Sequence, residues 1–202
     1  MPRKLTSEEI EAQKDFMYER TVKLIARKDI DSITLDDILE EVQMAKGSFY
    51  KYYPSKEIFL YEVIKKNERI FSEKMFETAQ MITVDLETAF ETMTDIIMSK
   101  DFLFQYTSPN DKEFLLRKMP LEYRKREEEK SKNNFLRLCQ GLNITPTEEF
   151  FGAITYLMNA LQIIVADTAV YGDNGRKKAV SIMIQAIYGL FTKEIEENGE
   201  NK

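Results

Sequence analysis

Lysine and tyrosine side chains suited to contacting a nucleic acid are concentrated in residues 43–56. This stretch, QMAKGSFYKYYPSK, contains three lysines and no acidic residue, so its net charge is +3. The whole chain carries a net charge of −6, which leaves −9 on the remaining residues. Because binding to phosphates requires local positive potential, the overall charge argues against a nucleic-acid partner. The net charge of +3 makes such a contact possible, but only through residues 43–56.

Side chains for enzyme chemistry are sparse. The chain has no histidine, which excludes a Ser-His-Asp triad, a Cys-His pair and a histidine-ligated zinc site. It likewise has no Glu-x-x-His pair and no glycine-rich phosphate loop. We therefore expect no catalytic residue, no metal and no cofactor, and we expect that the protein is not an enzyme.

The compartment is indicated by the cysteine count and the N-terminal segment. Cys139 is the single cysteine, which forbids an internal disulfide and is typical of a reduced, intracellular protein. Residues 1–10 are polar and do not resemble a secretion signal. The longest uncharged run, 150–166, has 17 residues, fewer than the roughly 20 of a membrane-spanning helix. We expect a cytoplasmic protein with no membrane segment.

The elements that must position the basic segment are predicted to be helices throughout the chain. Seven glycines and five prolines fall between segments with the apolar periodicity of helices, and no hairpin pattern is present. A first helix is expected to begin at Ser7, with Ser7 as its cap, and to be followed by a break at 29–33. Thr34 and Asp37 have capping-box spacing, which predicts the start of a second helix.

The basic segment itself is predicted to hold a third helix, from Ala45 to about Tyr52, ended by Pro54. Its inward residues are expected to be Ala45, Phe49 and Tyr53. Ser55 is the predicted cap of a fourth helix that extends towards Gln80. Further helices are expected at 83–100, 102–106, 111–141 with a kink at Pro120, 145–171 and 174–198, with Gly141, Gly172 and Gly199 as C-caps.

Short helices with a tight turn between the second and third form the skeleton of a helix-turn-helix. The segments TLDDI, from Thr34, and AKGSFYKYYPSKE, from Ala45, resemble the DNA-binding signature of the TetR (tetracycline repressor) family. The resemblance covers about residues 8–65; beyond residue 80 only length and helical character agree. It implies an all-α fold, with a helix-turn-helix DNA-binding domain at 1–55 joined by a connecting helix to a ligand-binding and dimerisation domain at 56–202. It also implies a dimeric, ligand-responsive transcription regulator, with repression as the family expectation.

The side chains of the basic segment suit the roles that this resemblance gives them. Lys46 and Ser48 can reach base edges in the major groove, and Gly47 lets the helix approach closely. Thr34 can offer its hydroxyl and first-turn amides to a phosphate, in addition to capping its helix. Tyrosine hydroxyls can meet phosphates and lysines can neutralise them. The DNA-binding candidates are Thr34, Lys46, Gly47, Ser48, Tyr50, Lys51, Tyr52 and Lys56.

Two observations weigh against these assignments. Asp36 and Asp37 flank Thr34 with negative charge, which is unfavourable beside DNA. Lys46, Gly47 and Ser48 could also be ordinary exposed residues of a helical protein, and Thr34 could be a simple N-cap. The whole motif favours DNA contact over that interpretation.

The last two predicted helices are apolar nearly all round, which predicts burial on two sides. A partner subunit would provide the second side, in a two-fold symmetric interface of four helices that sets the two recognition helices about 34–36 Å apart on a palindromic operator. The predicted interface residues are Leu161, Ile164, Val165, Val180, Met183, Ile184, Ile187, Leu190 and Phe191.

Aromatic and methionine side chains are frequent between residues 90 and 163, and most are expected in the core. The functional alternative is an apolar cavity between helices, holding a bulky hydrophobic or planar small-molecule effector, cationic or neutral, whose binding shifts the DNA-binding equilibrium. The candidates for that cavity are Met93, Ile97, Phe104, Gln105, Tyr123, Phe135, Tyr156, Asn159 and Gln162.

Other functions remain compatible with the sequence. The chain could activate transcription instead of repressing it. It could also be a helical adaptor or ligand-binding protein whose N-terminal region does not bind DNA; a dimer without salt-sensitive DNA affinity would favour this class.

Overall fold

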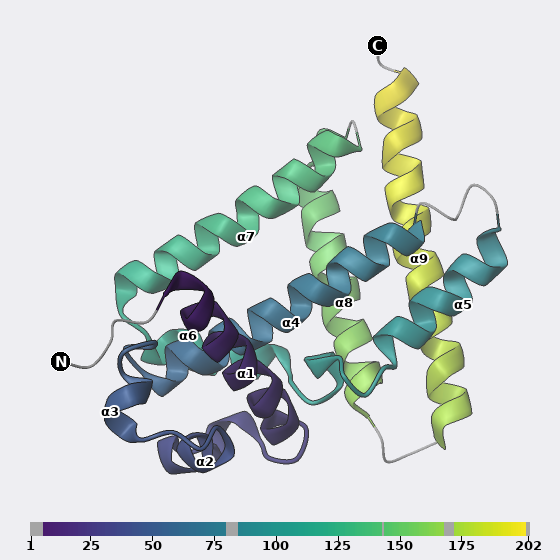
Figure 1. The fold of residues 1–202 in the computed structure, drawn as a ribbon. Helices are drawn as coiled ribbons and strands as arrows, with labels where there is room; N and C mark the ends of the chain where they lie inside the picture. Colours follow the sequence, from purple (N-terminus) through teal and green to yellow (C-terminus); the bar gives the residue numbers. More distant parts are fainter. Residues whose placement is uncertain (1–5, 80–84, 143, 168–171, 201–202) are drawn as a thin grey trace.

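The computed structural model describes residues 6–79, 85–142, 144–167 and 172–200, and they form helices and connecting turns without a strand (Figure 1). The all-α prediction is confirmed. The predicted helix limits at Gln80, Thr83 and Tyr171 lie outside the described residues. The elements are α1 (Ser7–Ile25), η1 (Ile30–Ser32), α2 (Leu35–Glu41), α3 (Lys46–Phe49), α4 (Lys56–Ala79), α5 (Leu86–Ile97), η2 (Leu103–Gln105), α6 (Pro109–Lys118), α7 (Leu121–Gly141), α8 (Glu148–Ala166) and α9 (Gly172–Glu200).

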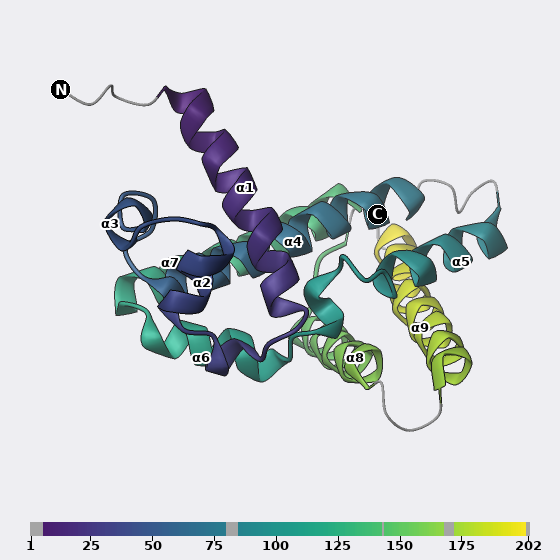
Figure 2. The same cartoon turned by 60° about the horizontal axis from the view of Figure 1, so that its bottom comes forward.

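The helices α1, α2 and α3 form a small head at one end of the molecule, and α4 leads away from it (Figures 1 and 2). The centre of the head is Phe49, which is fully buried and meets Phe59 of α4 edge-on, with 5.4 Å between ring centroids. Tyr53 packs on the same Phe59 ring at 4.6 Å. This apolar cluster continues along α4 and reaches Leu115 in α6. The head therefore shares its core with the connecting helix and is not packed separately.

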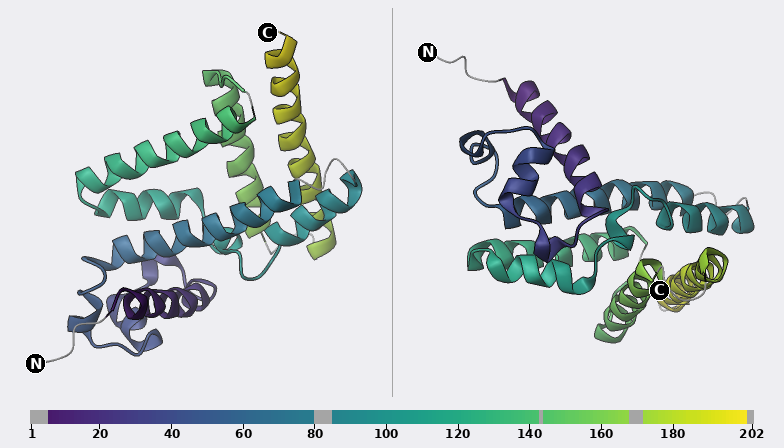
Figure 3. Two further views of the ribbon diagram at one scale, coloured as in Figure 1. Left: turned by 45° about the horizontal axis from the view of Figure 1, so that its top comes forward. Right: turned by 90° about the horizontal axis from the view of Figure 1, so that it is seen from below.

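The body consists of α4 to α9 (Figure 3). At the far end of α4, α9 packs against both α5 and α8. A stack of three nearly parallel rings lies in this core, with centroids 4.4 Å apart for Phe71 and Phe102 and 5.2 Å apart for Phe102 and Phe104. A smaller apolar cluster around Cys139 and Phe150 joins the end of α7 to α8. The core of the body thus consists of these two clusters and the part of the head cluster that extends along α4 to α6.

Several predicted boundaries differ from the structure. Pro120 does not kink one helix but precedes α7 as its N-cap, and the chain reverses direction between α6 and α7 (Figure 1). The reversal follows from proline, which cannot continue the hydrogen bonding of α6. Gly172 has a φ of +73° and begins α9, whereas α8 already ends at Ala166. Ala45 is exposed, as the N-cap of α3, and is not part of the core.

Other boundaries agree closely. The N-cap of α1 is Thr6, one residue before the predicted Ser7. The Ser55 hydroxyl accepts a hydrogen bond from the Ile58 amide at 3.2 Å, which confirms Ser55 as the cap of α4. At the other end of the chain, α7 includes Gly141 and α9 includes Gly199, so the two predicted C-caps lie inside the ends of their helices.

Candidate nucleic-acid interface

The start of α2 is fixed by Thr34 and Asp37 in the predicted capping box. The Thr34 hydroxyl accepts from the Asp37 amide at 3.1 Å, and an Asp37 carboxylate oxygen accepts from the Thr34 amide at 2.7 Å. The Thr34 hydroxyl also donates to that oxygen at 2.6 Å. The hydroxyl is therefore already engaged within the head, and a phosphate contact by Thr34 would have to share it.

The negative charge of Asp37 is compensated within the head. The Lys28 ammonium lies 2.5 Å from the Asp37 carboxylate. This hydrogen bond, followed by those from Thr34, holds the pKa of Asp37 far below its ordinary value, so the carboxylate stays ionised and paired. Lys28 was not among the sequence candidates, because nothing in the linear pattern brings it to α2. The pairing answers the objection that Asp37 would repel DNA.

The turn between α2 and α3 depends on Gln43. This residue has a φ of 50°, in the left-handed region that non-glycine residues rarely occupy. The Met44 amide donates to the Leu39 carbonyl at 3.0 Å across the turn. The tight turn sets the direction in which α3 leaves α2.

Two residues of the helix α3 are exposed to solvent. Lys46 and Gly47 are exposed and Ser48 is half-buried, whereas Phe49 anchors the opposite side in the head core. A Cβ atom at Gly47 would meet nothing within 4 Å. The protein's own packing therefore does not require glycine at this position. A surface without a side chain at Gly47 lets a neighbouring molecule approach the backbone of α3.

The tyrosines after α3 are not equivalent. Tyr50 is 47% exposed, and its ring meets Phe49 edge-on at a centroid distance of 5.6 Å. Tyr52 is half-buried and packs against the head core. Lys51 between them is exposed. Tyr50 and Lys51 are therefore the more accessible of the three candidates.

The Lys56 side chain points back into the head. Its ammonium donates to the Ile33 carbonyl, directly before Thr34. This bond links the first residue of α4 to the entrance of α2. Lysine has three donors, so two remain for other partners. The sequence predicted only a charge for DNA; the structure adds an internal role in the head.

The comparisons with known proteins agree with this geometry. Residues 18–63 match the family model for bacterial regulatory proteins of the tetR family. This match covers the helix-turn-helix region and supports a TetR-family regulator. The match runs from the second half of α1 into α4 and contains every candidate for DNA contact. The match therefore supports a DNA-binding transcriptional regulator.

Two solved structures are similar over most of their length. One, from Vibrio parahaemolyticus, is described as a TetR-family transcriptional regulator; it is 17% identical, with 89% of this chain and 97% of that chain covered and a TM-score of 0.45. The other, a transcriptional regulator from Cytophaga hutchinsonii, is 16% identical, with coverage of 95% and 98% and a TM-score of 0.43. At these scores they assign no role to any residue of the body. No curated protein matches the chain.

The nine candidates for effector binding do not converge on one place. Met93, Ile97 and Phe104 are buried together in the core between α5, α8 and α9. Tyr123 donates to Glu62 at 2.7 Å, on the side of α4 near the head. Phe135 belongs to the cluster at the end of α7. None of the nine lines the open groove of about 390 Å³ between α1, α4 and α7.

The other polar candidates for effector binding also differ in their surroundings. Gln105 and Gln162 are occupied by internal hydrogen bonds, to Ser99 and Thr107 respectively. Tyr156 is 79% exposed and Asn159 is also exposed, on the outside of α8. Gln162 points inward while Asn159, three residues earlier, points outward. The two helix faces could not be assigned from a sequence that is apolar nearly all round.

The predicted interface residues divide into buried and half-buried side chains. Leu161, Val165, Val180 and Ile184 are buried in the protomer's own core, so they are not the side chains that a partner would meet. Ile164, Met183, Ile187, Leu190 and Phe191 are half-buried. The sequence missed the outward-facing apolar residues, of which the most exposed are Tyr156, Ile163 at 64% and Ile182 at 54%. Tyr156 and Ile163 are seven residues apart, which places them on one face of α8, but the sequence does not show whether that face is the core or the surface.

Length and composition single out α8, among the described helices, as able to cross a membrane. Only 22% of its apolar stretch is buried within the protomer. One such helix is weak evidence for a membrane span, since any apolar partner could cover the same face.

Proposed function

We propose that this TetR-family regulator is a cytoplasmic repressor that binds a palindromic operator as a homodimer and is released by a small hydrophobic effector. The proposal keeps the predicted division into a DNA-binding domain at 1–55 and a body at 56–202, and assigns no catalytic activity. Its main support is the surface of α3, where Lys46 and Gly47 are exposed above a fully buried Phe49. In a helix-turn-helix this surface enters the major groove.

The roles of the candidates follow from their exposure. Lys46 and Ser48 read base edges, with lysine favouring guanine O6 and N7. Tyr50 and Lys51 contact phosphates, which positions the helix without specifying sequence. Lys56 and Thr34 act first on the shape of the head, through their bonds to Ile33 and Asp37. Their loss is expected to weaken DNA binding mainly by displacing α2.

A second copy of the chain is the proposed partner of α8 and α9. Exposed apolar patches on a protein surface mark interaction sites, and Tyr156, Ile163 and Ile182 are large, apolar and uncovered. Two protomers paired through these helices would bury a face that is now open on each. An effector would enter the apolar core near Met93 and Phe104. It would favour a body conformation in which the distance between the two heads no longer fits the operator. A coupling free energy of about 1–3 kcal/mol suffices for such a response.

The test is an electrophoretic mobility shift on a duplex that the wild-type protein selects from a random pool. Lys46→Ala is expected to reduce affinity by about 1–3 kcal/mol and to relax the preference at one base pair, whereas Tyr50→Phe is expected to weaken binding to all sequences equally. Lys125→Ala, an exposed lysine of α7, serves as a control that leaves affinity unchanged. If no duplex is selected, or if both head variants bind like the wild type, the adaptor class is favoured instead.

A further inference from the structure

Asn67, in the middle of α4, is a buried polar side chain with partners in both the head and the body. It is 1% exposed. Its amide nitrogen donates to the Tyr18 hydroxyl in α1 at 3.0 Å and to the Asp101 carbonyl at 2.9 Å. Its amide oxygen accepts from the Leu103 amide at 2.8 Å. One side chain therefore joins α1 of the head to the segment between α5 and α6.

These bonds leave Asn67 little freedom to move. Both amide hydrogens and the amide oxygen are used, so the orientation of the group is fixed by its partners. A buried polar group that loses its partner costs about 1–3 kcal/mol. A displacement of the Leu103 segment would therefore either break its bonds to Asn67 or turn the amide away from Tyr18.

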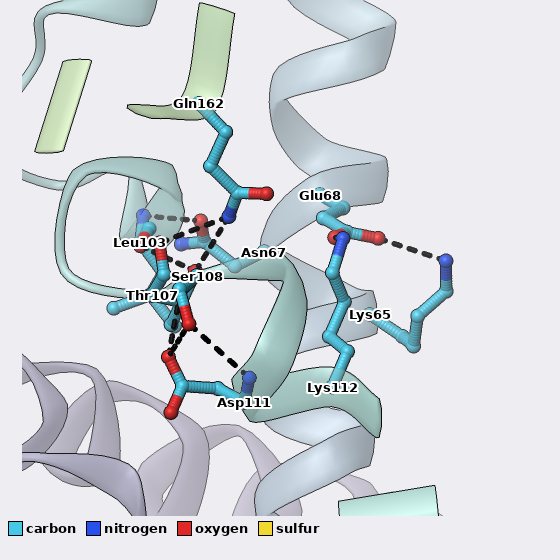
Figure 4. A network of polar contacts seen from close by, with 9 residues as sticks. All are labelled: Lys65, Asn67, Glu68, Leu103, Thr107, Ser108, Asp111, Lys112 and Gln162. Atoms are coloured by element: carbon cyan, nitrogen blue, oxygen red, sulfur yellow. Dashed lines mark hydrogen bonds and ion pairs between the residues drawn. The ribbon is translucent and has the colours of Figure 1, made fainter. Parts of the chain in front are cut away.

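The connection continues into the body (Figure 4). The Thr107 hydroxyl donates to the Leu103 carbonyl at 3.0 Å, and Gln162 of α8 donates to the Thr107 carbonyl at 3.0 Å. Gln162 is 2% exposed. Next to Leu103, Phe102 lies between Phe71 and Phe104 in the ring stack. Rearrangement of this apolar core would thus move the segment that Asn67 holds.

A second polar contact holds α6 beside α4, as Figure 4 also shows. Glu68 pairs with Lys65 at 2.8 Å and with Lys112 of α6 at 2.9 Å. Burial alone would raise the pKa of Glu68, but the charges of Lys112 and Lys65 outweigh it and lower the pKa. This contact does not involve the head. Asn67 is bonded to the head through Tyr18, and the adjacent Lys66, which Figure 4 does not draw, also pairs with Asp15 of α1.

We propose that Asn67 is the positioning residue that couples the head to the body, by making the placement of α1 depend on the placement of the Asp101–Leu103 segment. The inference rests on the proposed function and deepens it, because it names the side chain through which a conformational change in the body would alter DNA binding by the head. Because coupling is reciprocal, DNA bound to the head must stabilise the Leu103 segment in return. This consequence can be measured without knowing the effector.

The variant Tyr18→Phe removes the hydroxyl that Asn67 contacts and keeps the ring, which Lys66 covers at 4.7 Å. The matched control is Tyr61→Phe, at a buried tyrosine of α4 in the apolar cluster against which the half-buried Tyr18 packs; the Tyr61 hydroxyl has no hydrogen bond to the described residues. Hydrogen exchange at the Leu103 amide is measured with and without the selected duplex at saturating concentration. The ratio of the two rates cancels any change in basal stability.

In the wild type and in Tyr61→Phe, the duplex is expected to slow Leu103 exchange at least about fivefold, the lower end of typical coupling. In Tyr18→Phe the ratio is expected to fall below about twofold, although the duplex still binds. Equal ratios in Tyr18→Phe and the wild type, or no slowing in a wild type that binds DNA, would overturn the role of Asn67 alone. Failure to select any duplex would overturn the proposed function and this inference together.

Discussion

The head and the body of this protein differ in how directly their local sequence determines their surfaces. In the head, Phe49 is buried and Lys46 and Gly47 are exposed, as the four-residue spacing of the inward positions around α3 predicts. In the body, Tyr156 lies outside while Gln162, further along the same helix, is buried. A helix with one apolar stripe reveals which side is the core, whereas a helix that is apolar all round does not. In the body, long-range packing decides which of the two apolar faces becomes the core.

The largest expected effect compares a buried and an exposed phenylalanine. Phe49→Ala removes the fully buried centre of the head core and is expected to reduce the free energy of unfolding by about 3–5 kcal/mol. Phe151→Ala, at a position 47% exposed on α8, is expected to cost much less in the isolated protomer. Thermal unfolding followed by circular dichroism measures both. Equal losses would show that the two regions are packed alike.

The next prediction concerns assembly through the open face of the body. Ile163→Asp places a charge where the proposed partner packs and is expected to convert the dimer to a monomer at micromolar concentration, with helical content unchanged. Leu121→Asp, at a 56% exposed position on α7, is the control and is expected to stay dimeric. Analytical ultracentrifugation distinguishes the two. A dimer that survives Ile163→Asp places the interface elsewhere.

A substitution at Gly47 is expected to change the stability of the head and its affinity for the operator in opposite directions. Gly47→Ala adds a methyl group into open space, so the helix is expected to gain about 0.5–1 kcal/mol of stability. Operator affinity is expected to fall at least about tenfold, which is about 1.4 kcal/mol, because the methyl group holds α3 away from the groove. Gly141→Ala, also with open space around it, is the control for DNA binding. Unchanged affinity in Gly47→Ala would mean that close approach of α3 to DNA does not depend on this glycine.

The smallest predicted effect is at the turn of the helix-turn-helix. Gln43 has a φ of 50°, which costs a non-glycine residue about 1–2 kcal/mol. Gln43→Gly relieves this cost but adds freedom to the unfolded chain, so a net gain of about 0.5–1 kcal/mol in unfolding free energy is expected. Chemical denaturation measures it. A loss of stability would mean that the Gln43 side chain makes a compensating contribution.

What the sequence predicted well depends on signals between near neighbours. The Thr34 capping box, Ser55 as a cap and the burial of Phe49 follow from spacings of a few residues, and the structure confirms each. What it missed depends on residues far apart. Lys28 meets Asp37 only after α1 and α2 pack together, and Asn67 meets Leu103 across 36 positions. The effector candidates lie in separate places for the same reason. A cavity depends on how helices pack together, which spacings along the chain do not show.

The central claim is that the head, through the surface around α3, carries the contact with DNA while the acidic body does not. The most direct test is the dependence of operator affinity on salt concentration. Lys51→Ala is expected to reduce the slope of log affinity against log salt by about one, the loss of one phosphate contact. Lys132→Ala, an exposed lysine on α7 of the body, is expected to leave the slope unchanged. A slope that drops with Lys132→Ala and not with Lys51→Ala would contradict the claim.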